Sequence, residues 1–266
     1  MSSPIWTAAA PSSEAHPYRG TVRRLVDAQH QVATLPLVDT IEEQAALERL
    51  LDATEPSLPA PCRHLHVLLA TPFRRRPARH ESRFRRKGDP RGVLYGAEEE
   101  TTALAEIAFW RLLFFAESPA TPWPDRPVQL TAFSADLASE RSLDLGRPPL
   151  DRDRSLWTHP TDYEPCLELA EAAREAAIEL LRYPSARDPR AGTNVAVFDC
   201  SAFASAEPLA YRTWYLVFDS GGVRAQREFP LARLAFDRKA FARDPRIAAL
   251  PWDRSGAATG REPRRR

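Results

Sequence analysis

Residues 92–115 read GVLYGAEEETTALAEIAFWRLLFF and join a short strand pattern to a long helix pattern. Gly92 and Gly96 bracket a few residues that favour a strand. The acidic run at 98–100 and the threonines at 101–102 favour a helix start, because carboxylates interact well with the positive end of the helix dipole and threonine caps helix N-termini. We therefore predict a helix over 102–115, with Leu104, Ile107, Ala108 and Leu112 facing the core.

The segments around this stretch show both kinds of pattern. Strands are predicted at 64–70, 128–133, 178–183, 194–198 and 213–218, and Ser220-Gly221-Gly222 predicts a hairpin turn into 223–227. A helix is predicted over 162–177, whereas the prolines of 144–161 predict an irregular loop. Because strands and helices do not alternate as in a doubly wound sheet, the sequence predicts a mixed α/β (α+β) fold in one compact domain.

The two ends of the chain differ in composition from its centre. Residues 1–18 are rich in Pro, Ser and Ala, which predicts a flexible tail. Thr40 and Glu43 have the spacing of a capping box, so residues 19–61 are predicted to form a helical extension. The catalytic domain is then expected at 62–236, followed by a C-terminal segment and basic tail at 237–266.

The composition excludes several classes of protein. The chain has 266 residues, of which 43% are hydrophobic and 27% charged, and its net charge is +1. This charge gives no global attraction to nucleic acid or anionic lipid. Membrane spans need about 18 or more apolar residues in a row, and neither such a run nor a secretory signal is found, so we expect a cytoplasmic protein with no membrane partner.

Cysteines and histidines give no sign of a structural framework or a metal centre. Cys62, Cys166 and Cys200 contain no C-x-x-C pair, so we expect them to be reduced and mostly buried. His64 and His66 have a spacing that metal sites use, but no cysteine or carboxylate partner lies nearby in the sequence. The sequence therefore predicts no metal site.

The segment 71–91 is strongly basic. Its eight arginines and one lysine against two acids give a local net charge of +7. Such a patch attracts a phosphate-bearing partner, and Phe73 and Phe84 are placed to stack on a ring. A solvated basic loop is the alternative, because charge runs are commonly just exposed faces.

Two further residues stand where a site is expected. Glu106 lies among apolar neighbours in the predicted helix, where a carboxylate needs a partner, a chemical task or a place at the polar edge of the helix. Ser185 follows the predicted strand 178–183, and strand ends in α/β folds often carry site residues. An ordinary turn serine is the alternative at this position.

Four motifs in this order resemble the RES domain, a bacterial family named for an Arg, a Glu and a Ser. They are Arg83-Phe84, 92–96, Thr102-Ala103-Leu104-Ala105-Glu106 and Arg182-Tyr183-Pro184-Ser185, and the segments 162–170 and 194–198 also resemble the family. The resemblance covers about 63–220. It implies a compact fold similar to ADP-ribosyltransferase toxins, an activity that degrades NAD or uses it to modify a target, and a cognate antitoxin as protein partner.

The resemblance also implies roles for individual residues. Arg83, Tyr95, Glu106 and Ser185 match the catalytic positions, and Arg74, Arg85 and Tyr183 are implied to help bind NAD, the substrate. The family's usual Gly-Gly-Arg-Trp-Asn-like context is Glu81-Ser82-Arg83-Phe84-Arg85 here, so Arg85 or Arg74 is an alternative for the role of Arg83.

These residue types suit cleavage of the nicotinamide–ribose bond. A carboxylate such as Glu106 stabilises an oxocarbenium-like transition state, and an arginine such as Arg83 holds phosphates. A tyrosine such as Tyr95 stacks on the nicotinamide ring, and a serine such as Ser185 hydrogen-bonds the ribose or the amide. Nicotinamide leaves as a neutral molecule, so no second carboxylate and no metal are required.

Other functions stay open at this point. A nucleic-acid-binding module built on 72–91 is one alternative, and a catalytically inactive interaction protein with the same fold is another. The absence of G-x-G-x-x-G argues against a dehydrogenase, and the absence of G-x-S-x-G argues against a serine hydrolase. Water, inorganic phosphate and a protein all remain candidate acceptors of the ADP-ribose group, and the oligomeric state is open.

Overall fold

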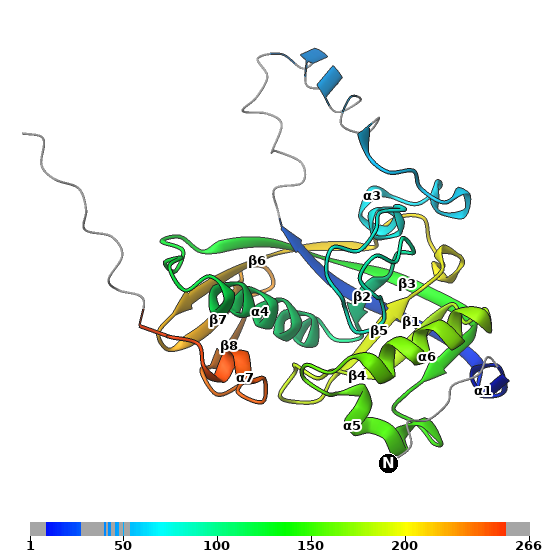
Figure 1. The fold of residues 1–266 in the computed structure, drawn as a ribbon. Helices are drawn as coiled ribbons and strands as arrows, with labels where there is room; N and C mark the ends of the chain where they lie inside the picture. Colours follow the sequence, from blue (N-terminus) through cyan, green and yellow to red (C-terminus); the bar gives the residue numbers. More distant parts are fainter. Residues whose placement is uncertain are drawn as a thin grey trace, which may run out of the picture.

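The fold is described from a computed structural model, which covers residues 9–27, 40, 42–43, 46–47, 50 and 54–253. Its sheet contains β1 (His16–Asp27), β2 (Leu94–Ala97), β3 (Val128–Asp144), β4 (Leu180–Pro184), β5 (Thr193–Val197), β6 (Ala210–Asp219), β7 (Gly222–Arg227) and β8 (Ala232–Asp237). The mixed α/β fold expected from the sequence is confirmed. Figure 1 shows the long β3 running through the centre of the molecule.

Five strands of the sheet close into a ring. The strand order is β1-β2-β5-β4-β3-β6-β7-β8, and β1 pairs with β3 as well as with β2. The β1–β3 pairing is antiparallel and extends from His16↔Ser142 to Asp27↔Leu130. The pairing of β3 with β4 is parallel, whereas β6, β7 and β8 extend the sheet beyond β3 by antiparallel pairing. The molecule therefore has a barrel-like end and an open-sheet end.

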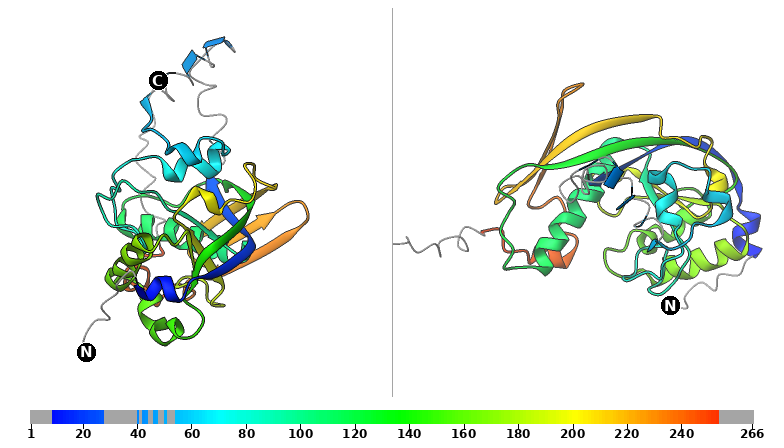
Figure 2. Two further views of the ribbon diagram at one scale, coloured as in Figure 1. Left: turned by 90° about the vertical axis from the view of Figure 1, so that its right-hand side faces the viewer. Right: turned by 90° about the horizontal axis from the view of Figure 1, so that it is seen from above.

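Helices cover one side of each end. The longer ones are α4 (Glu100–Glu117) and α6 (Glu164–Glu175), and the short ones are α1 (Ala9–Ser13), α3 (Val67–Ala70), α5 (Arg154–Trp157) and α7 (Pro245–Ala248). Short 3-10 turns are η3 (Ala60–Cys62), η4 (Thr71–Phe73), η5 (Leu150–Asp153) and η6 (Cys200–Ala202). Figure 2 shows the sheet arching over α4 and α7 at one end and over the remaining helices at the other.

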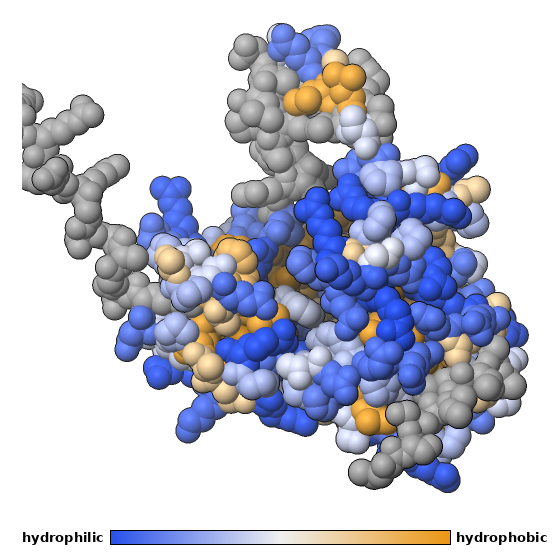
Figure 3. Space-filling model, in the orientation of Figure 1, coloured by the Kyte–Doolittle hydropathy of each residue, from blue (hydrophilic) through white to orange (hydrophobic). Residues whose placement is uncertain are grey.

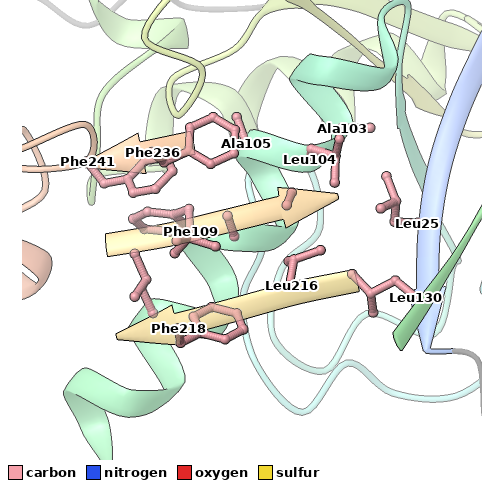
Figure 4. Close-up of a cluster of buried hydrophobic side chains, with 14 of the residues drawn as sticks. Leu25, Ala103, Leu104, Ala105, Phe109, Leu130, Leu216, Phe218, Phe236 and Phe241 are labelled. Atoms are coloured by element: carbon pink, nitrogen blue, oxygen red, sulfur yellow. The ribbon is translucent and has the colours of Figure 1, made fainter. Parts of the chain in front are cut away.

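The apolar core follows this division. At the open-sheet end, α4 packs on β6–β8 through a cluster that includes Leu104, Phe109, Phe218 and Phe236, drawn in Figure 4. At the barrel-like end, α6 packs on β4 and β5 around Trp157. Each cluster fixes one wall of the space between α4 and the ring of strands.

Most elements after residue 92 agree with the sequence prediction. The predicted helices at 102–115 and 162–177 are α4 and α6, and the predicted strands at 128–133, 178–183, 194–198 and 213–218 are β3 to β6. β3 extends to Asp144, well beyond its predicted end. The predicted loop 144–161 contains η5 and α5, and the sequence analysis missed β8 and α7.

The strand predicted at 64–70 is wrong. Residues Val67–Ala70 form α3, whose N-cap His66 accepts a hydrogen bond from the Leu68 amide through its side chain. Val67 is exposed and Leu69 is buried. A short apolar run fits both a strand and a helix turn, and here the local cap determined the outcome.

The N-terminal tail and helical extension are wrong for residues 9–27. Instead of a tail at 1–18 and helix from 19, α1 is followed by β1, whose Val22 and Leu25 are buried in the sheet. The capping box is present, because the Glu43 amide donates to Thr40 Oγ1 and the Thr40 amide donates to a Glu43 carboxylate oxygen. Most of the remaining predicted extension up to 53 lies outside the described residues.

The expectation of three reduced cysteines is also wrong. Cys62 at the end of η3 and Cys200 at the start of η6 form a disulfide, with their Cα atoms 5.4 Å apart across a sequence separation of 138. Cys166 is free and buried. Sequence spacing carried no signal of this pairing, since the fold alone brings η3 and η6 together.

Among the residues that the structure describes, none of the helices has the length and apolar character that a membrane span needs.

Gly92 directly follows the segment 71–91 and packs against the backbone near the start of that segment. We predict that Gly92→Ala destabilises the fold. A Cβ atom there would lie 2.1 Å from the Pro72 carbonyl oxygen and 2.5 Å from Phe73 Cα, so backbone must shift. Overpacking of this kind costs about 1–3 kcal/mol, measurable by urea unfolding.

Gly221→Ala is the matched control, since its Cβ would meet only a side-chain oxygen of Asp219 at 3.1 Å. Equal stabilities of the two variants would contradict the close packing of Gly92.

Candidate functional site

A cavity of about 300 Å³ lies between α4 and the barrel-like ring of strands. It is lined by Arg23, Arg24, Leu25, Ser82, Arg83, Tyr95, Gly96, Ala97, Ala103, Glu106, Ile107, Trp110, Tyr163, Tyr183, Arg187 and Asn194. Glu106 is the single carboxylate in this set, whereas four arginines are present. The segments that meet here come from β1, the basic segment, β2, α4, β4 and β5.

Glu106 is held by two side chains from the neighbouring strands. It is half-buried on α4, and its Oε1 accepts hydrogen bonds from Ser185 Oγ at 2.7 Å and from Asn194 Nδ2 at 2.6 Å. No described residue is seen to donate to Oε2. The two hydrogen bonds fix the carboxylate while leaving one oxygen for a ligand.

Ser185 supports Glu106 from behind and does not line the cavity. Its hydroxyl donates to Glu106 and accepts hydrogen bonds from the amides of Arg187 at 3.1 Å and Asp188 at 2.9 Å. A serine hydroxyl has one proton and two lone pairs, so these three partners saturate it. In this structure the Ser185 hydroxyl contacts the Glu106 carboxylate, and its predicted contact with a ribose or an amide stays a prediction.

Arg83 is buried without a carboxylate partner among the described residues. Its guanidinium donates to the carbonyls of Trp157 at 2.7 Å and His159 at 3.0 Å, and it lies over the Tyr163 ring at 4.8 Å. Carbonyls orient the group without neutralising its charge. A buried positive charge of this kind favours an anion in the adjacent cavity.

The guanidinium groups of Arg23 and Arg24 on β1 are also oriented by backbone carbonyls. Arg24 donates to the Tyr95 carbonyl at 2.9 Å, and Arg23 donates to the carbonyls of Thr21 and Glu98. Burial lowers the pKa of the Arg24 guanidinium. In the described part of the chain neither arginine has a carboxylate partner, so three arginines present uncompensated charge to the cavity.

Two tyrosines predicted for the site lie in the cavity wall. The Tyr95 hydroxyl shares a hydrogen bond with Ser82 Oγ at 2.9 Å and accepts one from the Phe84 amide at 3.1 Å, so it fixes the turn that carries Arg83. Burial and the nearby Glu106 charge raise the pKa of Tyr183 well above its ordinary value. Tyr183 is therefore a neutral hydroxyl that remains able to donate.

Arg74 and Arg85 do not line the cavity. Arg74 donates to the Pro56 carbonyl at 3.1 Å, and Arg85 donates to the carbonyls of Asp89 and Arg76. The structure therefore places these two arginines outside the cavity that Glu106 and Arg83 line, and their help in holding NAD stays a prediction. They brace the basic segment, whose fold turns only Arg83 inward.

Some arginines of the basic segment 71–91 form ion pairs with carboxylates. Arg86 pairs with Glu164 at 2.7 Å and Glu171 at 2.9 Å, and Arg91 pairs with Asp89 at 2.7 Å. Hydrophilic side chains cover this side of the molecule around α3 (Figure 3). These ion pairs reduce the positive field that a nucleic-acid-binding surface would need.

Several cavity residues were missed by the sequence analysis. Arg23 and Arg24 fell in the predicted helical extension, and Arg187 and Asn194 were given no role. Asn194 is buried, and its Oδ1 has no hydrogen-bond partner among the described residues. One feature of the sequence could have indicated Asn194: it is a polar residue at the start of β5, opposite Tyr183 on β4.

No group of His, Cys, Asp and Glu that would hold a metal ion occurs among the described residues.

Comparisons with known proteins identify a protein family and a similar solved structure. The family model described as RES domain matches residues 58–219. The chain is also similar to a chain in the crystal structure of the M. tuberculosis MbcT-MbcA toxin-antitoxin complex, with 14% sequence identity, a TM-score of 0.42, and coverage of 74% of this chain and 83% of that chain. No curated protein matches. The family match leaves out β1 and everything after β6.

We predict that Ser185→Ala lowers the free energy of unfolding by about 1–3 kcal/mol, because it removes one donor to Glu106 and leaves two buried amides unsatisfied. Urea unfolding measures the loss. Ser201→Ala is the matched control, since Ser201 Oγ donates to Glu179 at an exposed position. A loss no larger than that of the control would contradict the saturated role of Ser185.

Proposed function

Because the chain belongs to the RES domain family, we propose that it consumes NAD by cleaving the bond between nicotinamide and ribose. RES domain proteins are often the toxin half of a toxin–antitoxin pair, so we also propose a toxin with a cognate antitoxin protein as partner. NAD is the substrate in this proposal, and no metal takes part.

The observation that carries the proposal is the charge pattern of the cavity. One carboxylate, Glu106, is fixed at Oε1 and faces a space lined by Arg23, Arg24 and Arg83, none of which has a carboxylate partner among the described residues. NAD has the complementary pattern, because it carries a positive nicotinamide ring next to a negative diphosphate. The cavity thus suits a dinucleotide better than a neutral or wholly cationic ligand.

Glu106 is suited to the bond cleavage itself. When the glycosidic bond breaks, its electron pair moves to the ring nitrogen, nicotinamide leaves neutral, and positive charge develops on the ribose. A fixed carboxylate next to that charge stabilises the transition state without reorganising. The free Oε2 accepts a hydrogen bond from the attacking oxygen and aligns it with the ribose C1′ atom.

The remaining cavity residues are suited to binding. Arginine forks hold the diphosphate, which we assign to Arg83 and Arg24 with Arg23 beside them. The rings of Tyr95 and Tyr183 bound the space for the nicotinamide.

The acceptor of the ADP-ribose group is water, inorganic phosphate or a protein side chain, which makes the enzyme a glycohydrolase, a phosphorylase or a transferase. In each case a bond forms between the acceptor oxygen and the ribose C1′ atom as the bond from C1′ to the nicotinamide nitrogen breaks. The ion pairs of Arg86 with Glu164 and Glu171 lower the net positive charge of the basic segment, which counts against the nucleic-acid-binding alternative.

We predict that the purified protein releases nicotinamide from NAD and that Glu106→Gln lowers the rate about 100-fold or more, since the neutral amide no longer stabilises the developing charge. Chromatography with mass spectrometry, with and without phosphate, identifies the product. Glu140→Gln, at a side chain that is 75% exposed, is the control. Intact NAD after prolonged incubation with folded wild-type protein would refute the proposal.

We predict that Arg24→Met raises the KM for NAD about 10- to 100-fold, because a charge-assisted hydrogen bond to a phosphate contributes about 1.5–3 kcal/mol. Steady-state kinetics and calorimetric binding of ADP-ribose measure the change. Arg19→Met on the same strand, at a side chain that is 79% exposed, serves for comparison. Equal affinity of Arg24→Met and wild type for ADP-ribose would exclude Arg24 as a phosphate ligand.

A further inference from the structure

One buried carboxylate of the C-terminal segment, that of Asp244, contacts an arginine of the cavity wall. Asp244 is the N-cap of α7 and lies beyond residues 58–219, which the RES domain model matches. Its Oδ2 is 3.0 Å from Arg187 Nη1, and the two side chains are 1% and 4% exposed. A residue outside the family match therefore controls a guanidinium in the cavity wall.

Arg187 lies close to Glu106 in the fold. Its backbone amide donates to Ser185 Oγ, which in turn donates to Glu106. Its guanidinium lies 3.8 Å from the centroid of the Phe109 ring, and Phe109 follows Glu106 by three residues on α4, which is about one helical turn. The guanidinium and the Glu106 carboxylate thus belong to adjacent parts of one wall.

Charge distinguishes Arg187 from the other arginines of the cavity. In the described part of the chain, Arg187 alone among the cavity arginines has a carboxylate partner, and Glu106 is the single carboxylate lining the cavity. A buried cation that loses its partner is strongly destabilised and moves toward the nearest anion. Glu106 is the carboxylate that lines the same cavity as Arg187.

Asp244 is itself fixed in place. Arg246 donates to it from Nε at 3.0 Å, from Nη2 at 2.8 Å and from the backbone amide at 2.9 Å. Tyr163 Oη and the Pro160 carbonyl accept from the other nitrogen of Arg187. These contacts hold the Asp244–Arg187 pair in place from both sides.

We propose that Asp244 is a positioning residue that keeps Arg187 from pairing with Glu106, and so keeps the Glu106 carboxylate available to the substrate. The inference rests on the proposed function for its kinetic test only. Asp244 touches neither the substrate nor Glu106, and it acts through Arg187.

The first test is Asp244→Asn, which removes the charge while asparagine can still cap α7. We expect kcat/KM for NAD to fall at least tenfold, and we expect Arg187→Met added to this variant to restore at least tenfold. Asp199→Asn, the same change at the N-cap of η6, is the matched control with wild-type activity expected. A double variant no more active than Asp244→Asn would overturn the proposal.

A second comparison remains valid if Asp244→Asn alone does not fold. Arg187→Met and Arg187→Met/Asp244→Asn should have the same kcat/KM. Once the Arg187 guanidinium is gone, Asp244 no longer affects the Glu106 carboxylate. A further loss in the double variant would assign Asp244 a role of its own and overturn the proposal.

A crystal structure of Asp244→Asn, or of its complex with an antitoxin, separates this inference from the proposed function. We expect a guanidinium nitrogen of Arg187 within about 4 Å of a Glu106 oxygen, the usual limit of an ion pair. An unmoved Arg187 would contradict the inference, whereas a wild-type protein that leaves NAD intact would contradict only the proposed function.

Discussion

The antiparallel pairing of β1 with β3 is the interaction on which the layout of the cavity depends. It closes five strands into a ring and places Arg23 and Arg24 beside β2, where the Tyr95 carbonyl accepts from Arg24. On the other side of β3, the pairing with β4 brings Ser185 to Glu106 of α4. Residues far apart in the sequence thus share one cavity because a single long strand pairs with three others.

Three arginine side chains in the cavity have no carboxylate partner among the described residues. Two largely buried guanidinium groups pair with carboxylates: Arg187 of the cavity wall with Asp244, and Arg227 with Glu100. Arg83 and Arg24 are instead oriented by backbone carbonyls, which leave their charge uncompensated. Such charges cost folding free energy, and an anionic ligand would offset that cost when it binds.

Local patterns predicted local structure, and long-range pairing escaped them. The helix that carries Glu106 was predictable because its acidic first turn and apolar positions lie within one segment. β1 was not, since the edge that makes it a strand is supplied by β3, about a hundred residues later. In the same way, the motif at Ser185 predicted a residue near Glu106, but only the fold shows that both lone pairs of its hydroxyl are occupied.

The outer strands beyond the family match have a practical consequence for recombinant work. A fragment trimmed to 58–219 would lose β1, so a long stretch of β3 would present unpaired amides and carbonyls along its edge. It would also lose β7 and β8, which cover the other end of the sheet. Bare edges of this kind recruit further strands from neighbouring molecules, so the shortened fragment would aggregate during expression rather than report on the enzyme.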